Sequence, residues 1–467
     1  MTRSKKNITG YLLSLALSLL AIFHTFFNIH KQEITQWDEA RHIVSALEML
    51  TNQQWLVTTY MGHPDYWNVK PPLAVWLIAL SYQLISPPLL ALRLPALIAT
   101  LITTYLVFLY AKRWAGFYAG LLASGFWLTA WPLFTSHAAR TADPDMVFIL
   151  FISAACYLLT RQAKRDFFWA YLLLGMAFLA KSFHVAPYGL AAFLYCSYLC
   201  YKRQLTLKQL LALPCVFLLP IAPWAVGRYI ADGGHFFEVM LFYDVIKRSH
   251  HTIAGAADES PLLYWRVLFF SGMSVALAIA GLGLLLTRAK SFSSHQLNAP
   301  FLLAGLWIIV PFITYSIAAT KLDWYIYGVF SPLAVICAVI IQQTWQILPR
   351  LGQLLVSILL ALNFLTQEYM LLDYIVYGAL IEDKCETALR QLSAQTLDKK
   401  AVVFMENNPS FLHPDINFYQ HHYATALMLK NIQLHKGGKA DFLKLPATNK
   451  AFLISVQGQI IARRDLP

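Results

Sequence analysis

The chain has 467 residues, of which 58% are hydrophobic and only 13% charged, and its mean hydropathy is +0.53. This composition excludes a soluble globular protein with a polar surface and indicates a polytopic membrane protein. The formal net charge of +12 comes mostly from basic residues on the predicted cytoplasmic side and in the basic C-terminal part, so it indicates contact with anionic membrane surfaces rather than with nucleic acid.

Apolar runs that approach or exceed the length of a membrane span recur from Tyr11 to about Met370. Some breaks between these runs are basic and match the basic N-terminus, so the positive-inside rule places them in the cytoplasm. The opposite breaks carry nearly all the acidic residues of this part and therefore lie outside. We predict eleven crossings, near residues 11–29, 90–111, 116–135, 145–160, 167–183, 185–201, 209–228, 262–287, 300–319, 324–344 and 350–370.

One apolar run, PPLAVWLIALSYQLIS at 71–86, is too short for a crossing. As a helix it is about 24 Å long, whereas the hydrocarbon core is roughly 30 Å thick. We therefore predict an interfacial or re-entrant helix on the outer side, within a first outer loop at 30–89. With eleven crossings and a cytoplasmic N-terminus, the C-terminus lies outside.

The last part of the chain has a different composition. From 381 to 467 charged and polar residues return, and the strand-like runs AVVFM (401–405) and AFLIS (451–455) flank a helix-like stretch. We predict two domains, a membrane domain at 1–380 and a small extracytoplasmic α/β domain at 381–467.

Two adjacent acids, Asp38 and Glu39, open the first outer loop. Thr35 is a suitable N-cap for a helix with its apolar face at residues 40, 43, 44, 47 and 50, which places both acids in the first turn. Acids at that position either complement the helix dipole or belong to a functional site.

A second acidic motif, Asp143-Pro144-Asp145, precedes a predicted span. It has the DxD form with which nucleotide-sugar enzymes hold a metal and a diphosphate, but it faces outward and no glycine-rich phosphate loop accompanies it. Because the residue before a proline avoids helical geometry and a helix often starts at proline, Asp143 is presented at the mouth of the membrane. Simple helix capping is the alternative.

The outer breaks also hold bases at span ends, where the positive-inside rule disfavours them. They either reach lipid phosphates by snorkelling or, with the interleaved acids, form a phosphate-handling site. We favour the second interpretation for the set as a whole, which includes Lys70, Arg140, Lys181, Lys247, Arg248 and Lys321.

Several segments together resemble a known family. They are NVKPPLAVWLIAL at 68–80, RLPAL at 93–97, ARTADPDMVF at 139–148, LAKS at 179–182 and ATKLDWYIYGVFSPLA at 319–334. Their order is similar to that in the GT-C glycosyltransferases, in the branch of the lipid A aminoarabinose transferase and the protein O-mannosyltransferases. The resemblance covers about residues 10–345 and leaves the C-terminal domain unmatched.

The resemblance implies an all-α polytopic fold and an enzyme of the bacterial inner membrane with a periplasmic active site. Such an enzyme transfers a monosaccharide from a polyprenyl (undecaprenyl) phosphate carrier to an envelope acceptor, such as lipid A or another glycan. The donor, the acceptor and membrane lipids are then its partners, and nucleic acid is not.

The resemblance also implies residue roles. Asp38 is the essential acid at the acceptor, Glu39 a weaker candidate and Asp143 the second acid. Cations stabilise the leaving lipid phosphate, and we assign this role to Lys70, Lys321, Arg140, Lys247 and Arg248. We assign substrate binding to Asp145, Lys181, Trp324 and Tyr325, although aromatic residues are also ordinary at the membrane interface.

The outer loop at 229–261 contains titratable residues together with glycine and alanine, which suits a substrate-gated flap. Its His250-His251 pair is a weak candidate for a divalent metal site with an acid of the first loop, and a solvated pair is the alternative. No other cofactor is expected.

Three further functions compete with glycolipid modification. A protein O-mannosyltransferase has the same membrane motifs but acts on polypeptide. A transporter or flippase for lipid-linked sugar is expected to carry ionisable residues in mid-span or matched broken helices, and the predicted spans carry almost none. A structural assembly partner has little use for outer acids and bases.

Overall fold

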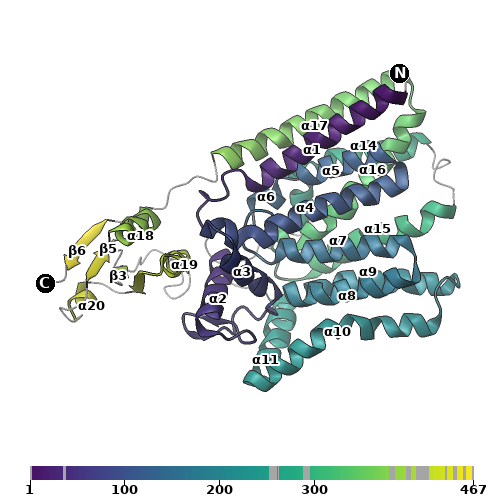
Figure 1. Ribbon diagram of the computed structural model, residues 1–467. Helices are drawn as coiled ribbons and strands as arrows, with labels where there is room; N and C mark the ends of the chain where they lie inside the picture. The colour runs from purple at the N-terminus through teal and green to yellow at the C-terminus, as the bar shows by residue number, and fades with distance from the viewer. Residues whose placement is uncertain are drawn as a thin grey trace.

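The computed structural model describes residues 3–34, 38–251, 260, 262–287, 295–377, 384–395, 401–405, 420–436, 439–444, 450–455 and 459–464. The predicted N-cap Thr35 and part of the predicted flap lie outside these residues. Long helices run side by side in a bundle, α2 and α3 lie at one end of it, and a small sheet lies beyond that end (Figure 1).

The bundle is built from helices that coincide with the predicted apolar runs. Its members are α1 (Arg3–Phe26), α4 (Pro88–Ala115), α5 (Phe117–Leu128), α6 (Pro132–Thr135), α7 (Asp145–Arg161), α8 (Lys164–Lys181), α9 (Ala186–Tyr201), α10 (Leu207–Asp232), α13 (Leu263–Phe270), α14 (Met273–Thr287), α15 (His295–Ile317), α16 (Phe330–Ile347) and α17 (Arg350–Val376). The short η1 (Ser182–Val185) joins α8 to α9.

Among the described residues, six helical stretches are long and apolar enough to cross a membrane, or seven if the bent pair α13 and α14 forms one span. The two helices of that pair meet at 86°. The chain is thus a multi-pass membrane protein, and the count of eleven crossings stays a prediction. One predicted span, 116–135, is divided, because α5 ends at Leu128 and a separate turn begins at Pro132, which has no amide hydrogen to continue a helix.

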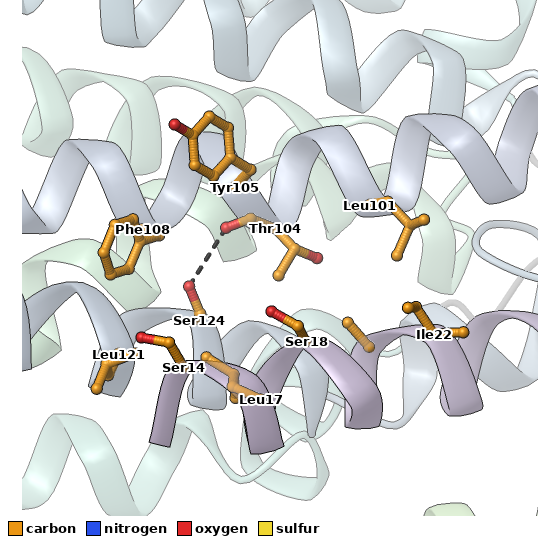
Figure 2. A pocket seen from close by; sticks show the side chains of 11 residues that line it. Ser14, Leu17, Ser18, Ile22, Leu101, Thr104, Tyr105, Phe108, Leu121 and Ser124 are labelled. Carbon is orange, nitrogen blue, oxygen red and sulfur yellow. Dashed lines mark hydrogen bonds between the residues drawn. The ribbon is translucent and has the colours of Figure 1, made fainter. Parts of the chain in front are cut away.

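A cavity of about 360 Å³ lies between α1, α4 and α5 (Figure 2). Hydroxyl groups in its wall donate to backbone carbonyls, Ser14 to Gly10 at 3.0 Å and Ser124 to Thr104 at 3.3 Å. The remaining lining is mostly hydrocarbon, and none of the lining residues belongs to the predicted site.

The end of the bundle that carries the predicted motifs has shorter elements. They are α2 (Asp38–Asn52), β1 (Thr59–Tyr60), β2 (His63–Pro64), α3 (Leu73–Leu84), α11 (His235–Leu241), the π-helix η2 (Phe242–Lys247), α12 (Arg248–His250) and the 3-10 helix η4 (Asp323–Val329). Asp38 and Glu39 occupy the first turn of α2, as predicted. The 12-residue α3 is about 18 Å long, which agrees with a helix too short to cross.

The predicted loop at 229–261 is largely helical in its described part. Helix α10 continues to Asp232, and α11, η2 and α12 follow almost without a break. Gly233 ends α10, with a positive φ of 74°. The proposed flap movement stays a prediction.

The C-terminal segment contains α18 (Lys384–Ala394), β3 (Ala401–Met405), α19 (Gln420–Leu429), β4 (Ile432–Lys436), α20 (Lys439–Lys444), β5 (Ala451–Ile454) and β6 (Ile460–Arg464). The strands form one sheet in the order β4-β3-β5-β6. Strand β3 pairs parallel with β4 and β5, and β6 pairs antiparallel with β5. Both predicted strands are present, while the domain boundary at 381 and the extracytoplasmic location stay predictions.

Candidate functional site

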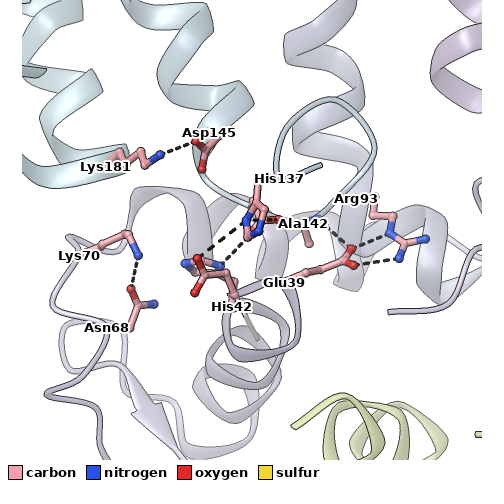
Figure 3. A network of polar contacts seen from close by, with 11 residues as sticks. Glu39, His42, Asn68, Lys70, Arg93, His137, Ala142, Asp145 and Lys181 are labelled. Atoms are coloured by element: carbon pink, nitrogen blue, oxygen red, sulfur yellow. Dashed lines mark hydrogen bonds and ion pairs between the residues drawn. The ribbon is translucent and has the colours of Figure 1, made fainter. Parts of the chain in front are cut away.

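The two adjacent acids of α2 lie in different environments. Glu39 is fully buried and forms a double ion pair with Arg93 of α4, with its Oε1 2.7 Å from Arg93 Nε (Figure 3). The same carboxylate oxygen accepts a hydrogen bond from the Ala142 amide at 2.9 Å. Glu39 therefore joins α2 to α4 and to the loop that carries Asp143. This placement argues against the predicted weaker catalytic role of Glu39.

Two buried arginines anchor this end of the bundle. Arg93 also donates to the carbonyls of residues 29, 32 and 33, and Arg140 donates to those of residues 24, 25 and 27. Burial lowers the pKa of Arg140 to about 10, so the guanidinium stays charged at neutral pH. Because Arg140 has no exposed surface and its terminal nitrogens face carbonyls, its geometry does not support the predicted binding of polyprenyl phosphate.

A second group of side chains gathers around Asp143. His42 Nδ1 lies 3.4 Å from Asp143 Oδ1, and His137 Nδ1 lies 3.7 Å from Asp143 Oδ2 and 3.9 Å from Asp38 Oδ2. The Asp143 side chain is 1% exposed, whereas Asp38 is 27% exposed. Asp38 is thus the carboxylate of this cluster that an incoming substrate can reach.

The cluster keeps Asp143 ionised. Burial by itself raises the pKa of Asp143, but the charge of His137 and the contact with His42 outweigh it and lower that pKa to about 2. Even so, both Asp143 oxygens, both His42 ring nitrogens and His137 Nδ1 make no hydrogen bond with the described part of the chain. These buried polar atoms lie close together but form no hydrogen bonds with one another.

The same cluster contains a candidate ligand set for a metal ion. One ligand atom each from Asp38, His137 and Asp143 lie within 4.8 Å of one another. Carboxylate oxygens and an imidazole nitrogen suit Zn²⁺ or Mn²⁺, and the unsatisfied buried atoms fit such an ion. His250 and His251 are exposed and belong to no such group within the described ranges, which favours the alternative of a solvated pair.

Aromatic side chains connect the cluster to a basic region. The Trp324 ring stacks on His137, with ring centroids 3.5 Å apart and an interplanar angle of 19°. Its neighbour Tyr325 accepts a hydrogen bond from Arg248 at 3.2 Å. Burial lowers the pKa of Arg248, but Asp244, Tyr325 and Asp38 reverse this effect and raise that pKa above its ordinary value. Arg248 is therefore a permanent cation within the electrostatic range of Asp38.

Two lysines extend the basic region. Lys181 forms a buried ion pair with Asp145 and lies 5.6 Å above the Tyr325 ring, and Lys70 donates to Asn68 at 2.8 Å (Figure 3). The charges of Lys181, Lys70 and Arg248 all act on the imidazole of His184. Three cations from separate segments thus lie within electrostatic range of one imidazole, and one of them, Arg248, is also within range of Asp38.

For the other two predicted cations, Lys321 and Lys247, the contacts described do not reach the acidic cluster. The Thr320 amide donates to the Arg248 carbonyl at 3.0 Å, which brings the segment of Lys321 beside Arg248. Lys321 is 9% exposed. Lys247 is exposed, and its ammonium lies 5.0 Å above the Tyr243 ring. The predicted phosphate-binding roles of these two lysines stay predictions.

Comparison with known sequences points to one group of enzymes. Residues 69–226 match the family described as dolichyl-phosphate-mannose-protein mannosyltransferase. The chain is 26% identical over 358 residues to an undecaprenyl phosphate-alpha-4-amino-4-deoxy-L-arabinose arabinosyl transferase of Edwardsiella ictaluri, covering 72% of this chain and 60% of that protein. A protein of the same name from Pseudomonas aeruginosa is 24% identical, with 68% and 58% covered. The chain thus spans about three fifths of the length of these relatives.

Solved structures agree on the fold. ArnT from Cupriavidus metallidurans bound to undecaprenyl phosphate has a TM-score of 0.67 at 18% identity, covering 94% of this chain and 87% of that one. The oligosaccharyltransferase AglB from Archaeoglobus fulgidus has a TM-score of 0.56 at 13% identity, with 91% and 64% covered. The chain therefore has the fold of these structures. The resemblance expected from the motif series is confirmed.

Several residues of this site were absent from the sequence-based prediction. His42 and His137 had not been selected, because an isolated histidine carries no recognisable ligand spacing. One signal was available, since Asp38 and His42 are four residues apart on a predicted helix and therefore share a face. No comparable signal linked Glu39 to Arg93, which are 54 residues apart in the chain.

Proposed function

We propose that this GT-C protein transfers a monosaccharide from a polyprenyl phosphate carrier to an acceptor at the outer face of the bacterial inner membrane. The main support is the adjacency of two groups at one end of the bundle. The cluster of Asp38, His42, His137 and Asp143 can handle a proton, and the cations Lys70, Lys181 and Arg248 can hold a phosphate. Trp324 and Tyr325 lie between the two groups.

The proposed chemistry is a substitution at the anomeric carbon of the sugar. The bond between that carbon and the carrier phosphate oxygen breaks, and a bond to the acceptor oxygen forms. Negative charge grows on the leaving phosphate, where preorganised cations stabilise it most effectively. Lys70, Lys181 and Arg248 are proposed for this role because all three charges lie within electrostatic range of the His184 imidazole.

Asp38 is the proposed acid–base residue. An attacking hydroxyl group transfers its proton to Asp38, and His137, 3.9 Å away, stabilises the carboxylate in the required orientation. An acceptor phosphate, as on lipid A, is already anionic and transfers no proton, in which case Asp38 orients it. A glycolipid such as lipid A, or another envelope glycan, is the proposed acceptor.

A divalent cation fits the proposed site. Asp38, His137 and Asp143 would hold it, and the unsatisfied atoms of Asp143 and His42 lie where its shell of ligands would form. When bound, such an ion lowers the negative potential of the two carboxylates and favours the approach of an anionic substrate. Elemental analysis of the purified protein tests this proposal, since Asp143→Asn must then reduce the bound metal.

Protein O-mannosylation is the second candidate. It is favoured by the match of residues 69–226 to the mannosyltransferase family, which includes Lys70, Asp143 and Lys181. A transporter or flippase for lipid-linked sugar is the alternative of another class. It receives less support, because α2, which carries Asp38 and Glu39, lies at one end of the bundle rather than within it (Figure 1).

Mass spectrometry of envelope lipids, glycans and proteins tests these functions. Cells that lack the protein are complemented with the natural chain or with Asp38→Asn at matched expression. We expect one sugar mass to disappear in the deletion strain and to return only with the natural chain, and its attachment point identifies the acceptor. Full restoration by Asp38→Asn contradicts the acid–base role, and an unchanged set of glycoconjugates contradicts sugar transfer.

A further inference from the structure

Helix α19 of the C-terminal segment packs directly against the helix that carries Asp38. Ala424 and Met428 share one hydrophobic cluster with Ile43 and Val44 of α2, and Ala142, which precedes Asp143, belongs to the same cluster. The side-by-side arrangement of α19 with α2 is visible at the end of the bundle (Figure 1). One surface of α19 thus packs on α2, within a hydrophobic cluster that also includes the loop of Asp143.

A polar contact accompanies this packing. The Tyr423 hydroxyl lies 3.4 Å from Glu48 Oε1, and Glu48 also accepts the Gly62 amide at 3.1 Å. Glu48 is 5% exposed. Burial, together with the charge of Glu48, raises the pKa of Tyr423 to about 12, so the hydroxyl stays a donor at neutral pH. The contact therefore persists across the physiological pH range.

The opposite face of α19 belongs to the sheet. Ala426 and Leu429 pack in a separate cluster with Leu389 of α18, Val403 of β3 and Leu434 of β4. Asn431, just after α19, exchanges hydrogen bonds with Ser393 of α18 at 2.6 and 2.9 Å. Helix α19 is thus held by the sheet on one side and holds α2 on the other.

Helix α2 depends on such external packing. Eleven of its 15 residues are buried, including the polar Glu39, His42 and Glu48. A helix of this composition gains most of its stability from tertiary contacts rather than from its own propensity. Helix α2 is held in place by packing against α3 and α4 on one side and against α19 on the other.

We propose that α19 is a positioning element of the active site, and that Met428 and Tyr423 fix α2 so that Asp38 meets His137 and the substrate. The C-terminal segment then acts on turnover, rather than serving only as a separate binding domain. The part of this inference that concerns turnover rests on the proposed sugar transfer. The part that concerns the placement of α2 does not.

The test uses the full chain in lipid nanodiscs. Met428→Ala and Tyr423→Phe are compared with the natural chain, with Met428→Leu as the conservative variant. Leu443→Ala serves as the matched control, because Leu443 lies in α20 of the same segment and is 59% exposed. Hydrogen exchange reports the protection of the α2 amides, and steady-state transfer gives kcat and the KM for the polyprenyl phosphate sugar.

For Met428→Ala we expect α2 amides to exchange about tenfold faster, with exchange in α9 unchanged. We expect kcat to fall roughly tenfold or more with a nearly constant donor KM, because small displacements of a catalytic group are costly. Tyr423→Phe produces a smaller change of the same kind, and Met428→Leu and Leu443→Ala behave like the natural chain.

Unchanged exchange in α2 for both Met428→Ala and Tyr423→Phe overturns the proposal. Faster exchange with an unchanged kcat also overturns it, because α2 then moves without consequence for turnover. If the natural chain transfers no sugar, the proposed function fails, and the exchange measurement alone still decides whether α19 fixes α2.

Discussion

Two adjacent acids in the first turn of α2 differ in role, because Glu39 holds the fold together and Asp38 is available to a substrate. On one side Glu39 is fully buried, paired with Arg93 and bonded to a backbone amide. On the other side Asp38 is partly exposed, and His137 lies 3.9 Å from its carboxylate. A buried ion pair loses much when one partner is removed, whereas a partly exposed carboxylate is free to interact with a substrate. Substitution of Glu39 is therefore expected to reduce stability, whereas substitution of Asp38 is expected to reduce activity.

The largest effect is expected at Asp38. Asp38→Asn preserves the size of the side chain but removes its basicity, so we expect transfer to a hydroxyl acceptor to fall by roughly 10²–10⁴-fold. Thermal stability should remain within about 0.5 kcal/mol of the natural chain. Transfer assays together with thermal unfolding in detergent measure both quantities. If Asp38→Asn loses activity only because the protein unfolds, the assignment of Asp38 as the acid–base residue is contradicted.

The opposite pattern is expected at Glu39. Glu39→Gln leaves the guanidinium of Arg93 buried without its counter-charge, which costs about 3–5 kcal/mol of folding free energy. Thermal unfolding and the yield of folded protein measure this loss. Activity for each correctly folded molecule should change far less than in Asp38→Asn. A stable but inactive Glu39→Gln protein indicates that Glu39 itself takes part in the reaction.

A smaller effect with a defined pH dependence is expected at Asp65. Arg41 donates two hydrogen bonds to its carboxylate, at 2.6 and 2.7 Å. Burial opposes ionisation, but Arg41 and two backbone amides lower the pKa of Asp65 below its ordinary value. A lowered pKa in the folded state means that Asp65 stabilises the fold above the unfolded pKa, about 3.9, and that this contribution is lost as the pH falls through the folded value.

Asp65→Asn should therefore destabilise the protein at pH 7, by about 2 kcal/mol or more. The difference from the natural chain should shrink below about pH 4. Unfolding curves recorded from pH 3 to pH 7 for both proteins test this expectation. A stability difference that does not depend on pH shows that packing, and not the charge of Asp65, is lost.

The smallest effect is expected at Tyr325. Tyr325→Phe removes the hydroxyl that accepts from Arg248 but retains the ring beneath Lys181. One hydrogen bond to a charged group is worth about 1.5–3 kcal/mol at most, so we expect the donor KM to rise by roughly tenfold, with kcat nearly unchanged. Donor titrations measure both constants. A fall in kcat alone indicates that Tyr325 acts on the transition state.

The elements predicted best are those with strong local signals. The apolar runs predicted the helices of the bundle, and Pro144 predicted the start of α7 at Asp145. The apolar spacing within 38–50 was sufficient to predict α2, and the motif series was sufficient to predict the resemblance to known glycosyltransferases. These features depend on residues close together in the chain, where periodicity and proline geometry are direct guides.

The features that were missed depend on distant contacts. His137 joins the site through Asp38 and Trp324, which are roughly 100 and 190 residues away in the chain. Arg140 carries the positive charge expected of a phosphate-binding residue, yet in the fold it donates hydrogen bonds to backbone carbonyls. Charge and motif membership alone therefore did not separate a binding cation from a structural one, because that distinction is made by burial.

The bonds of Arg140 also bear on how the protein is made. Its guanidinium binds the carbonyl of His24, 116 residues earlier in the chain, and two further carbonyls at the end of α1. Helix α1 is synthesised before α4 and α5, but its terminal carbonyls acquire this partner only after α4, α5 and the following loop have been synthesised. The bonds that fix the end of α1 to the loop of His137 and Asp143 therefore cannot form before that loop has been synthesised.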